Sequence, residues 1–159
     1  MLWLTLEQTK RLVDAAEAAH PEEACALLIG RRGLGLNFRV SRVEISPNVA
    51  ADRRRRFEVD PGLRIGLERE LRGKADQVIG VWHSHPNGLA EPSAADAAMI
   101  YEPDLVWLIT AVVAGQAIHT AAFIPQAGGA AAPSGKLGVS RTPCGGFRPF
   151  GFGIVAPAE

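Results

Sequence analysis

Two histidines separated by one residue are the strongest chemical signal in the chain. His83 and His85 lie in the apolar run that begins at Val81. In an extended strand, residues at i and i+2 point to the same face, with Cα atoms about 6 to 7 Å apart. Two imidazoles at that separation can converge on one metal ion, so this segment is predicted to provide half of a metal site.

Asp96 is the predicted third ligand. Pro86, Gly88 and Pro92 bend the chain after the histidines, and Ser93 can then begin a short helix with Asp96 in its first turn. The partial positive charge at a helix N-terminus favours an ionised carboxylate there. Two imidazoles, one carboxylate and a fourth position for water are typical of catalytic zinc. Ser93 and Asp96 are also an ordinary capping pair, and this alternative stays open.

A hydrolytic zinc site also needs a general base, and Glu23 is the candidate. It lies within Pro21–Cys25, at an expected junction between a helix and a strand, where a carboxylate could reach over the metal. The neighbouring Glu22 would then face away. The alternative is that both are solvated carboxylates of a loop.

The elements that must position these residues alternate between helix and strand. Thr5 and Gln8 form a capping box for a first helix that ends at His20–Pro21, and Asp60–Pro61 begins a second helix that reaches Gly73. A third, short helix is expected from Ser93 to Ile100. Strands are expected at Cys25–Ile29, Leu36–Ser41, Gln77–His83, Leu105–Thr110 and Ala117–Ile124. This order predicts an α/β fold with a sheet flanked by helices.

The composition changes after residue 125. Residues 126–159 are rich in Gly, Ala, Pro and Ser, and we expect a partly flexible tail that follows a domain of residues 1–125. Phe147, Phe150 and Phe152 could anchor this tail on the domain, on a second copy or on a partner, and the sequence does not choose among these.

Length and charge narrow the class of protein. The chain has 159 residues, 47% of them hydrophobic, and a formal net charge of zero, as expected of one globular domain without a general attraction to nucleic acid or membranes. No apolar run is long enough to span a bilayer and no secretory signal is evident, so a cytoplasmic location is expected. Cys25 and Cys144 are expected to be reduced thiols.

Together these residues resemble the JAMM (MPN+, Mov34/PAD-1) metalloprotease family. The family pattern is a Glu followed far downstream by His-x-His-x7-Ser-x-x-Asp, matched here by Glu23, His83, His85, Ser93 and Asp96. The segment from Pro21 to Gly30 also matches the family pattern around the glutamate, except that Ala26 replaces the usual glycine. Asn48, Arg56–Phe57 and Asp60–Pro61 also resemble family positions. The resemblance covers residues 5 to 125.

The resemblance implies a single-domain MPN (JAB/cytidine-deaminase-like) fold with a curved mixed β-sheet flanked by helices. It also implies one zinc ion held by His83, His85 and Asp96, with Glu23 as general acid/base and Ser93 stabilising the oxyanion. Family members cut after the C-terminal glycine of ubiquitin-like proteins, and the short bacterial type resembles the peptidase that frees cysteine from a ThiS/MoaD-like sulfur carrier. A small ubiquitin-fold carrier is therefore the expected partner, and a homodimer is left open.

Other functions fit the chain less well. Zinc deaminases need His-x-Glu and Pro-Cys-x-x-Cys, which the chain lacks. The segment from His85 to Ser93 also resembles RadC proteins, but the residues around Glu23 do not. A Ser-His-Asp hydrolase built from Ser84 or Ser93 is possible on residue types but disfavoured, and alternation turns Ser84 away from both histidines. A non-catalytic MPN scaffold is the remaining alternative, although the chain retains all the ligands.

A run of arginines lies outside the predicted zinc site. Arg53–Arg56 is a run of four arginines just before Phe57. It could bind an acidic surface of the carrier protein. It could also be only a solvated loop, and nucleic-acid binding is disfavoured because no aromatic platform or recognition motif accompanies it.

Overall fold

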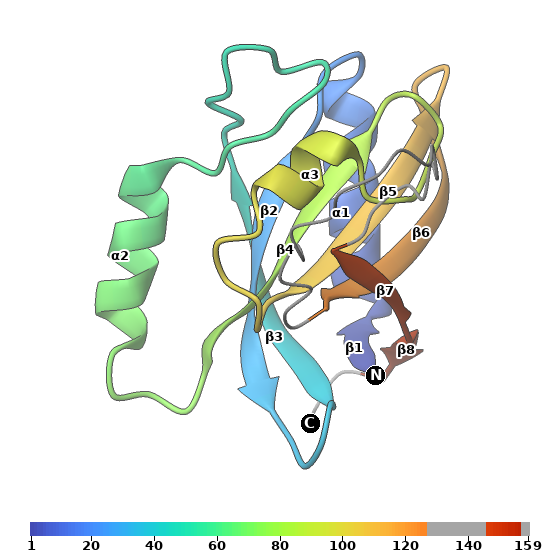
Figure 1. The fold of residues 1–159 in the computed structure, drawn as a ribbon. Helices are drawn as coiled ribbons and strands as arrows, with labels where there is room; N and C mark the ends of the chain where they lie inside the picture. Colours follow the sequence, from blue (N-terminus) through green and yellow to red (C-terminus); the bar gives the residue numbers. More distant parts are fainter. Residues whose placement is uncertain (127–145, 157–159) are drawn as a thin grey trace, which may run out of the picture.

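One eight-stranded sheet organises the chain in a computed structural model that describes residues 1–126 and 146–156 (Figure 1). The N-terminal half contains β1 (Leu2–Thr5), α1 (Leu6–Ala19), β2 (Cys25–Arg32), β3 (Phe38–Ser46) and α2 (Pro61–Leu71). The remainder contains β4 (Gln77–His85), α3 (Ala94–Ala98), β5 (Val106–Val113), β6 (Gln116–Pro125), β7 (Phe147–Phe150) and β8 (Phe152–Val155).

The sheet is mixed and strongly curved. Its strand order is β7-β6-β5-β4-β2-β3-β1-β8, with β4 parallel to β5 and antiparallel to β2. The two edge strands, β7 and β8, follow each other in the chain with only Gly151 between them. Because one residue cannot bridge a flat sheet of eight strands, the sheet must curl until its edges approach each other. The expected fold class, a curved mixed sheet flanked by helices, is confirmed.

Helices cover both faces of this sheet (Figure 1). On one face, Leu12 and Ala16 of α1 pack into a core cluster with Trp82 of β4. On the other face, Leu67 and Leu71 of α2 pack on Leu27 and Ile29 of β2, and α3 lies near the end of β4. Alternate residues of β4 therefore enter different cores, and the histidines face the side of α2 and α3.

The helix ends follow the capping chemistry expected from the sequence. Thr5 accepts a hydrogen bond from the Gln8 amide and the Gln8 side chain accepts one from the Thr5 amide, which completes the capping box of α1. Asp60 caps α2 through the Gly62 amide, with Pro61 as the first helical residue. These caps satisfy amides that have no partner inside the helix.

Three strands were not expected from the sequence. They are β1, which begins at residue 2, and β7 and β8, which belong to the segment 126–159 that was predicted to be a tail. Of the three possible anchors for its aromatic residues, the structure selects the domain itself: Phe147 is buried, and Phe150 and Phe152 pack partly buried against the core. The predicted flexibility of residues 127–145, and the state of Cys144, lie outside the described residues.

Among residues 1–126 and 146–156, no helix is both long and apolar enough to cross a membrane.

Candidate active site

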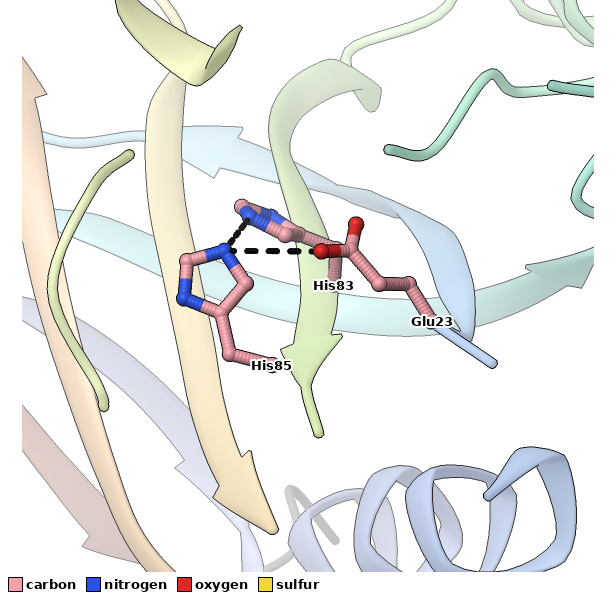
Figure 2. A group of neighbouring side chains, drawn as sticks. All are labelled: Glu23, His83 and His85. Atoms are coloured by element: carbon pink, nitrogen blue, oxygen red, sulfur yellow. Dashed lines mark hydrogen bonds and ion pairs between the residues drawn. The ribbon is translucent and has the colours of Figure 1, made fainter. Parts of the chain in front are cut away.

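Two imidazoles at the end of β4 form the centre of the candidate site. Their rings point to the same side of the strand, as the alternation of an extended chain predicts (Figure 2). The Nε2 atoms of His83 and His85 are 2.9 Å apart, and both side chains are buried. Two nitrogens that approach this closely can share a proton or bind a common cation.

Asp96 faces both of these nitrogens. Its Oδ1 lies 3.2 Å from Nε2 of His83, and its Oδ2 lies 3.2 Å from Nε2 of His85. The capping box at the start of α3 orients the carboxylate, because the Ser93 amide donates to Oδ2 over 2.7 Å while the Asp96 amide donates to Oγ of Ser93. Asp96 therefore acts as a capping residue of α3 and at the same time faces both histidines, so the capping interpretation and the metal-ligand interpretation are compatible.

Glu23 reaches the histidines through the pairing of β2 with β4. Cys25 lies opposite His83 in this antiparallel pair, so the residue two positions before Cys25 lies beside His85. Oε1 of Glu23 is 3.9 Å from Nε2 of His85, and Figure 2 shows the carboxylate turned toward the two rings. The ligand atoms of Glu23, His83 and His85 all lie within 4.8 Å of one another.

Ser84 holds this junction together from the opposite face. Its Oγ accepts a hydrogen bond from the Ala24 amide over 2.8 Å, and its own amide donates to the Ala24 carbonyl over 3.0 Å. The predicted orientation of Ser84, away from the histidines, is thus confirmed. Its side chain fixes the backbone beside Glu23 and takes no place among the candidate ligands.

The loop between β3 and α2 also fixes Glu23, which sequence reasoning did not anticipate. The Glu23 amide donates to the Arg53 carbonyl over 2.7 Å, and the Glu23 carbonyl accepts from Nδ2 of Asn48 over 2.9 Å. The same Asn48 side chain donates to the Arg56 carbonyl and accepts from the amides of Ala50 and Glu58. Asn48 was noted only as a position that resembles the family pattern, and no local signal shows which loop it closes.

The surroundings of the imidazoles set their orientation. Nδ1 of His85 lies 2.8 Å from the Leu89 carbonyl, which can only accept a hydrogen bond. That contact places a proton on Nδ1 and directs Nε2 into the cluster, the orientation typical of a metal-binding histidine. The ring of Phe57 stacks on His83 with centroids 4.2 Å apart and excludes solvent from that side.

The donor set fits a divalent metal ion. Two imidazole nitrogens and carboxylate oxygens converge, and Oε2 of Glu23 is buried without a hydrogen-bond partner within the described part of the chain. A buried carboxylate oxygen left without a partner is costly unless a ligand or a water molecule satisfies it. Two imidazole nitrogens and one carboxylate oxygen, with the Glu23 carboxylate beside them, are ligands that zinc prefers.

Burial shapes the ionisation of these groups. It raises the pKa of Glu23 to about 7, against the opposing influence of His85, and it lowers the pKa of His83. Burial also disfavours the charged form of Asp96, but the interaction with His83 and the hydrogen bonds from both histidines and Ser93 hold its pKa well below its ordinary range. The site therefore combines one firmly ionised carboxylate with one that exchanges a proton near neutral pH.

A comparison with known proteins agrees with this geometry. A family model described as prokaryotic homologs of the JAB domain matches residues 6–123, which contain all of the residues of the candidate site. The chain belongs to this family. The match includes the β2, β4 and α3 segments that carry Glu23, His83, His85 and Asp96, and it ends before β7 and β8.

Curated members of the family include peptidases. The chain is 30% identical over 96 residues to the desampylase of Haloferax volcanii, an alignment that covers 60% of this chain and 67% of that protein. It is 25% identical over 112 residues to the CysO-cysteine peptidase of Mycobacterium bovis, covering 69% and 72% of the two chains. These relatives support a peptidase activity.

Solved structures share the whole architecture. A protein of Desulfitobacterium hafniense, known from its solution structure, superposes with a TM-score of 0.77 at 26% identity and covers 100% of this chain and 96% of its own. A protein of Salinibacter ruber gives a TM-score of 0.62 at 23% identity with the same coverage, a similarity of fold alone. The described fold therefore recurs in proteins of both organisms.

Proposed function

We propose that this chain is a zinc-dependent peptidase that hydrolyses the bond after the C-terminal glycine of a ubiquitin-like or sulfur-carrier protein. The observation that carries the proposal is the convergence of Glu23, His83, His85 and Asp96 in one buried site of a JAB-family fold. A domain that served only as a scaffold would not need a buried carboxylate without a hydrogen-bond partner beside two imidazoles.

His83, His85 and Asp96 would hold the metal. The proton on Nδ1 of His85 and the capping box of α3 fix the two side chains before any ion binds, so little reorganisation is needed. When bound there, zinc would supply a Lewis acid and lower the pKa of a coordinated water molecule.

Glu23 would act as general base and then as general acid. Its carboxylate takes a proton from the attacking water molecule and delivers it to the nitrogen of the leaving amine, so the peptide bond breaks with no net change in the enzyme. In the metal-free site burial raises the pKa of Glu23 to about 7, so the surroundings of this carboxylate favour its accepting a proton. The Ser93 hydroxyl would donate a hydrogen bond to the oxyanion that develops on the scissile carbonyl.

The choice of substrate follows the curated relatives. Their names identify one as a desampylase and another as a CysO-cysteine peptidase. A small carrier protein of the ubiquitin fold with a C-terminal glycine is therefore the proposed partner. The proposed location of the reaction is the cytoplasm.

The test separates the metal site from the catalytic base. Purified protein should contain about one zinc ion per chain, since the site offers three protein ligands and one open position. Glu23→Gln should keep the zinc and lose at least about 100-fold in hydrolysis of carrier–peptide fusions, the effect typical of removing a general base. His83→Ala and Asp96→Ala should lose the zinc.

Glu22→Gln is the matched control, because Glu22 adjoins Glu23 but its side chain is 45% exposed and pairs with Arg53 at the surface. This variant should keep both zinc and activity. Full activity of Glu23→Gln would refute the base assignment. Unchanged zinc in both His83→Ala and Asp96→Ala would refute the metal site, and zinc binding without hydrolysis of any carrier fusion would favour the scaffold.

A further inference from the structure

The four arginines of the β3–α2 loop lie directly beside the candidate active site. The carbonyl of Arg53 accepts the Glu23 amide over 2.7 Å, so the backbone of the loop is bonded to the backbone of the proposed catalytic base. Asn48 closes the loop through four hydrogen bonds, two of which go to the residues Glu23 and Arg56. In Figure 1 the loop lies above the sheet, at the end that carries α3. Its arginines therefore have a defined position relative to the reacting centre.

The loop leaves most of its positive charge without a partner. Arg53 forms an ion pair with Glu22 at 3.4 Å, but within residues 1–126 and 146–156 the guanidinium groups of Arg54, Arg55 and Arg56 form no ion pair, and all three residues are exposed. Such groups are available to a partner because no existing interaction has to be broken first.

A second group of arginines provides a contrast at the other end of the sheet. Arg31 pairs with Asp76, and Arg42 pairs with Glu70 and Glu44, in and beside a groove of about 640 Å³. Acidic groups of the chain itself balance Arg31 and Arg42, while Arg11 and Arg39 in the same groove donate to the backbone carbonyls of Val43 and Ala156. The β3–α2 loop is therefore the stronger candidate for recognition of an acidic surface.

A hollow adjoins the loop. Its volume is about 660 Å³, and Arg56, Phe57, Met99 and Tyr101 line it together with the acidic Asp52 and Glu58. Phe57 also stacks on His83, so one ring borders both the hollow and the candidate metal site.

We propose that Arg54, Arg55 and Arg56 form a docking surface for an acidic face of the protein substrate, next to the active site. The inference rests on the proposed function, because it assigns the surface to the partner whose tail is cleaved. A nucleic acid is the less suitable occupant, since the only ring within the loop, Phe57, is buried against His83 and cannot stack on a base. Exposed charges at such a border mainly increase the rate of association and make it sensitive to salt.

Binding can be tested without any hydrolysis. The full chain, labelled with ¹⁵N, is titrated with a short poly-L-glutamate peptide and separately with oligothymidylate of equal length, at low and at about 0.3 M ionic strength. The peptide should shift the amide signals of residues 50–58 first, and the higher salt should suppress these shifts. Arg54→Ala/Arg55→Ala should weaken peptide binding by about fivefold, the loss expected for two exposed charges.

Arg69→Ala/Arg72→Ala is the matched control, because it removes the same charge at the far end of α2 and should leave binding unchanged. Shifts confined to the groove of Arg31 and Arg42, equal losses in both double variants, or tighter binding of oligothymidylate at the loop would each overturn the proposal.

The same variants separate this proposal from the proposed function. With a carrier fusion as substrate, Arg54→Ala/Arg55→Ala should raise KM and reduce the salt dependence of kcat/KM while kcat is unchanged. Zinc content should also be unchanged. Loss of kcat or zinc in this variant would overturn the docking role. Failure of hydrolysis in the unmodified protein, with the peptide still bound at the loop, would instead count against the peptidase assignment alone.

Discussion

The burial of Glu23 predicts a pH-dependent cost to the metal-free protein. Its pKa is raised from 4.5 to about 7, chiefly by burial, so the folded state favours the protonated acid. The stability that this group contributes is complete below pH 4.5 and is lost as the pH rises through about 7. Glu23→Gln, which replaces the carboxylate with a neutral group of the same shape, should abolish that loss.

The ordinary and the raised pKa of Glu23 together give the size of this loss of stability. Because proton binding is linked to folding, the raised pKa of Glu23 lowers the free energy of unfolding by about 1 kcal/mol at pH 5 and by about 3 kcal/mol at pH 8. The free energy of unfolding of Glu23→Gln, relative to the parent chain, should therefore rise by about 2 kcal/mol between these pH values. Urea unfolding of chelator-treated protein, followed by tryptophan fluorescence, measures this difference.

The neighbouring Glu22 provides the control for this unfolding measurement. Glu22→Gln removes the neighbouring carboxylate, which lies in an exposed ion pair, and its effect should stay within about 1 kcal/mol at both pH values. A difference for Glu23→Gln that does not change with pH would show that the folded protein does not hold this carboxyl in an environment that favours its protonated form. The assignment of a raised pKa to Glu23 in the metal-free site would then be wrong.

Three further predictions concern the supports of the site. Burial raises the pKa of the Cys25 thiol to about 12, so in a Cys144→Ser background it should react with a disulfide reagent at neutral pH only after unfolding, and prompt labelling of the native protein would contradict this. Asn48→Ala, which leaves the carbonyl of Glu23 and two loop amides without their partner, should lower the free energy of unfolding by about 2 kcal/mol; Asn37→Ala, at an exposed hairpin, is the control and should change it far less. Ser84→Ala should cost about 1 to 3 kcal/mol in the same assay because the buried Ala24 amide loses its acceptor, and a cost near zero would show that this bond does not hold the junction.

Local chemistry made several elements predictable. The capping box of α1 and the Asp60–Pro61 start of α2 appear where the sequence indicated, because a cap depends on residues within one turn of each other. The same locality explains the common face of His83 and His85, since alternation along a strand needs no distant contact.

Long-range pairing explains what was not predicted. β1, β7 and β8 are four residues long each, too short for a periodic pattern, and they are strands because neighbouring edges offer unpaired backbone groups. Gly151 separates two strands on opposite edges of the sheet, and nothing in the segment 147–155 announces that the sheet must curl to bring those edges together.

The sequence by itself determined the chemistry that could occur: a pair of imidazoles on one strand face, and a capping box that places a carboxylate three residues after the N-cap serine. Both depend on the fixed geometry of short segments. The sequence named Glu23 as a candidate, but only the tertiary structure brings it to the histidines. Glu23 meets His85 through the register of Cys25 opposite His83, and a shift of one residue would turn Glu23 to the other face. The tertiary structure also decided that the arginine loop is bonded to Glu23, since that contact joins residues thirty positions apart.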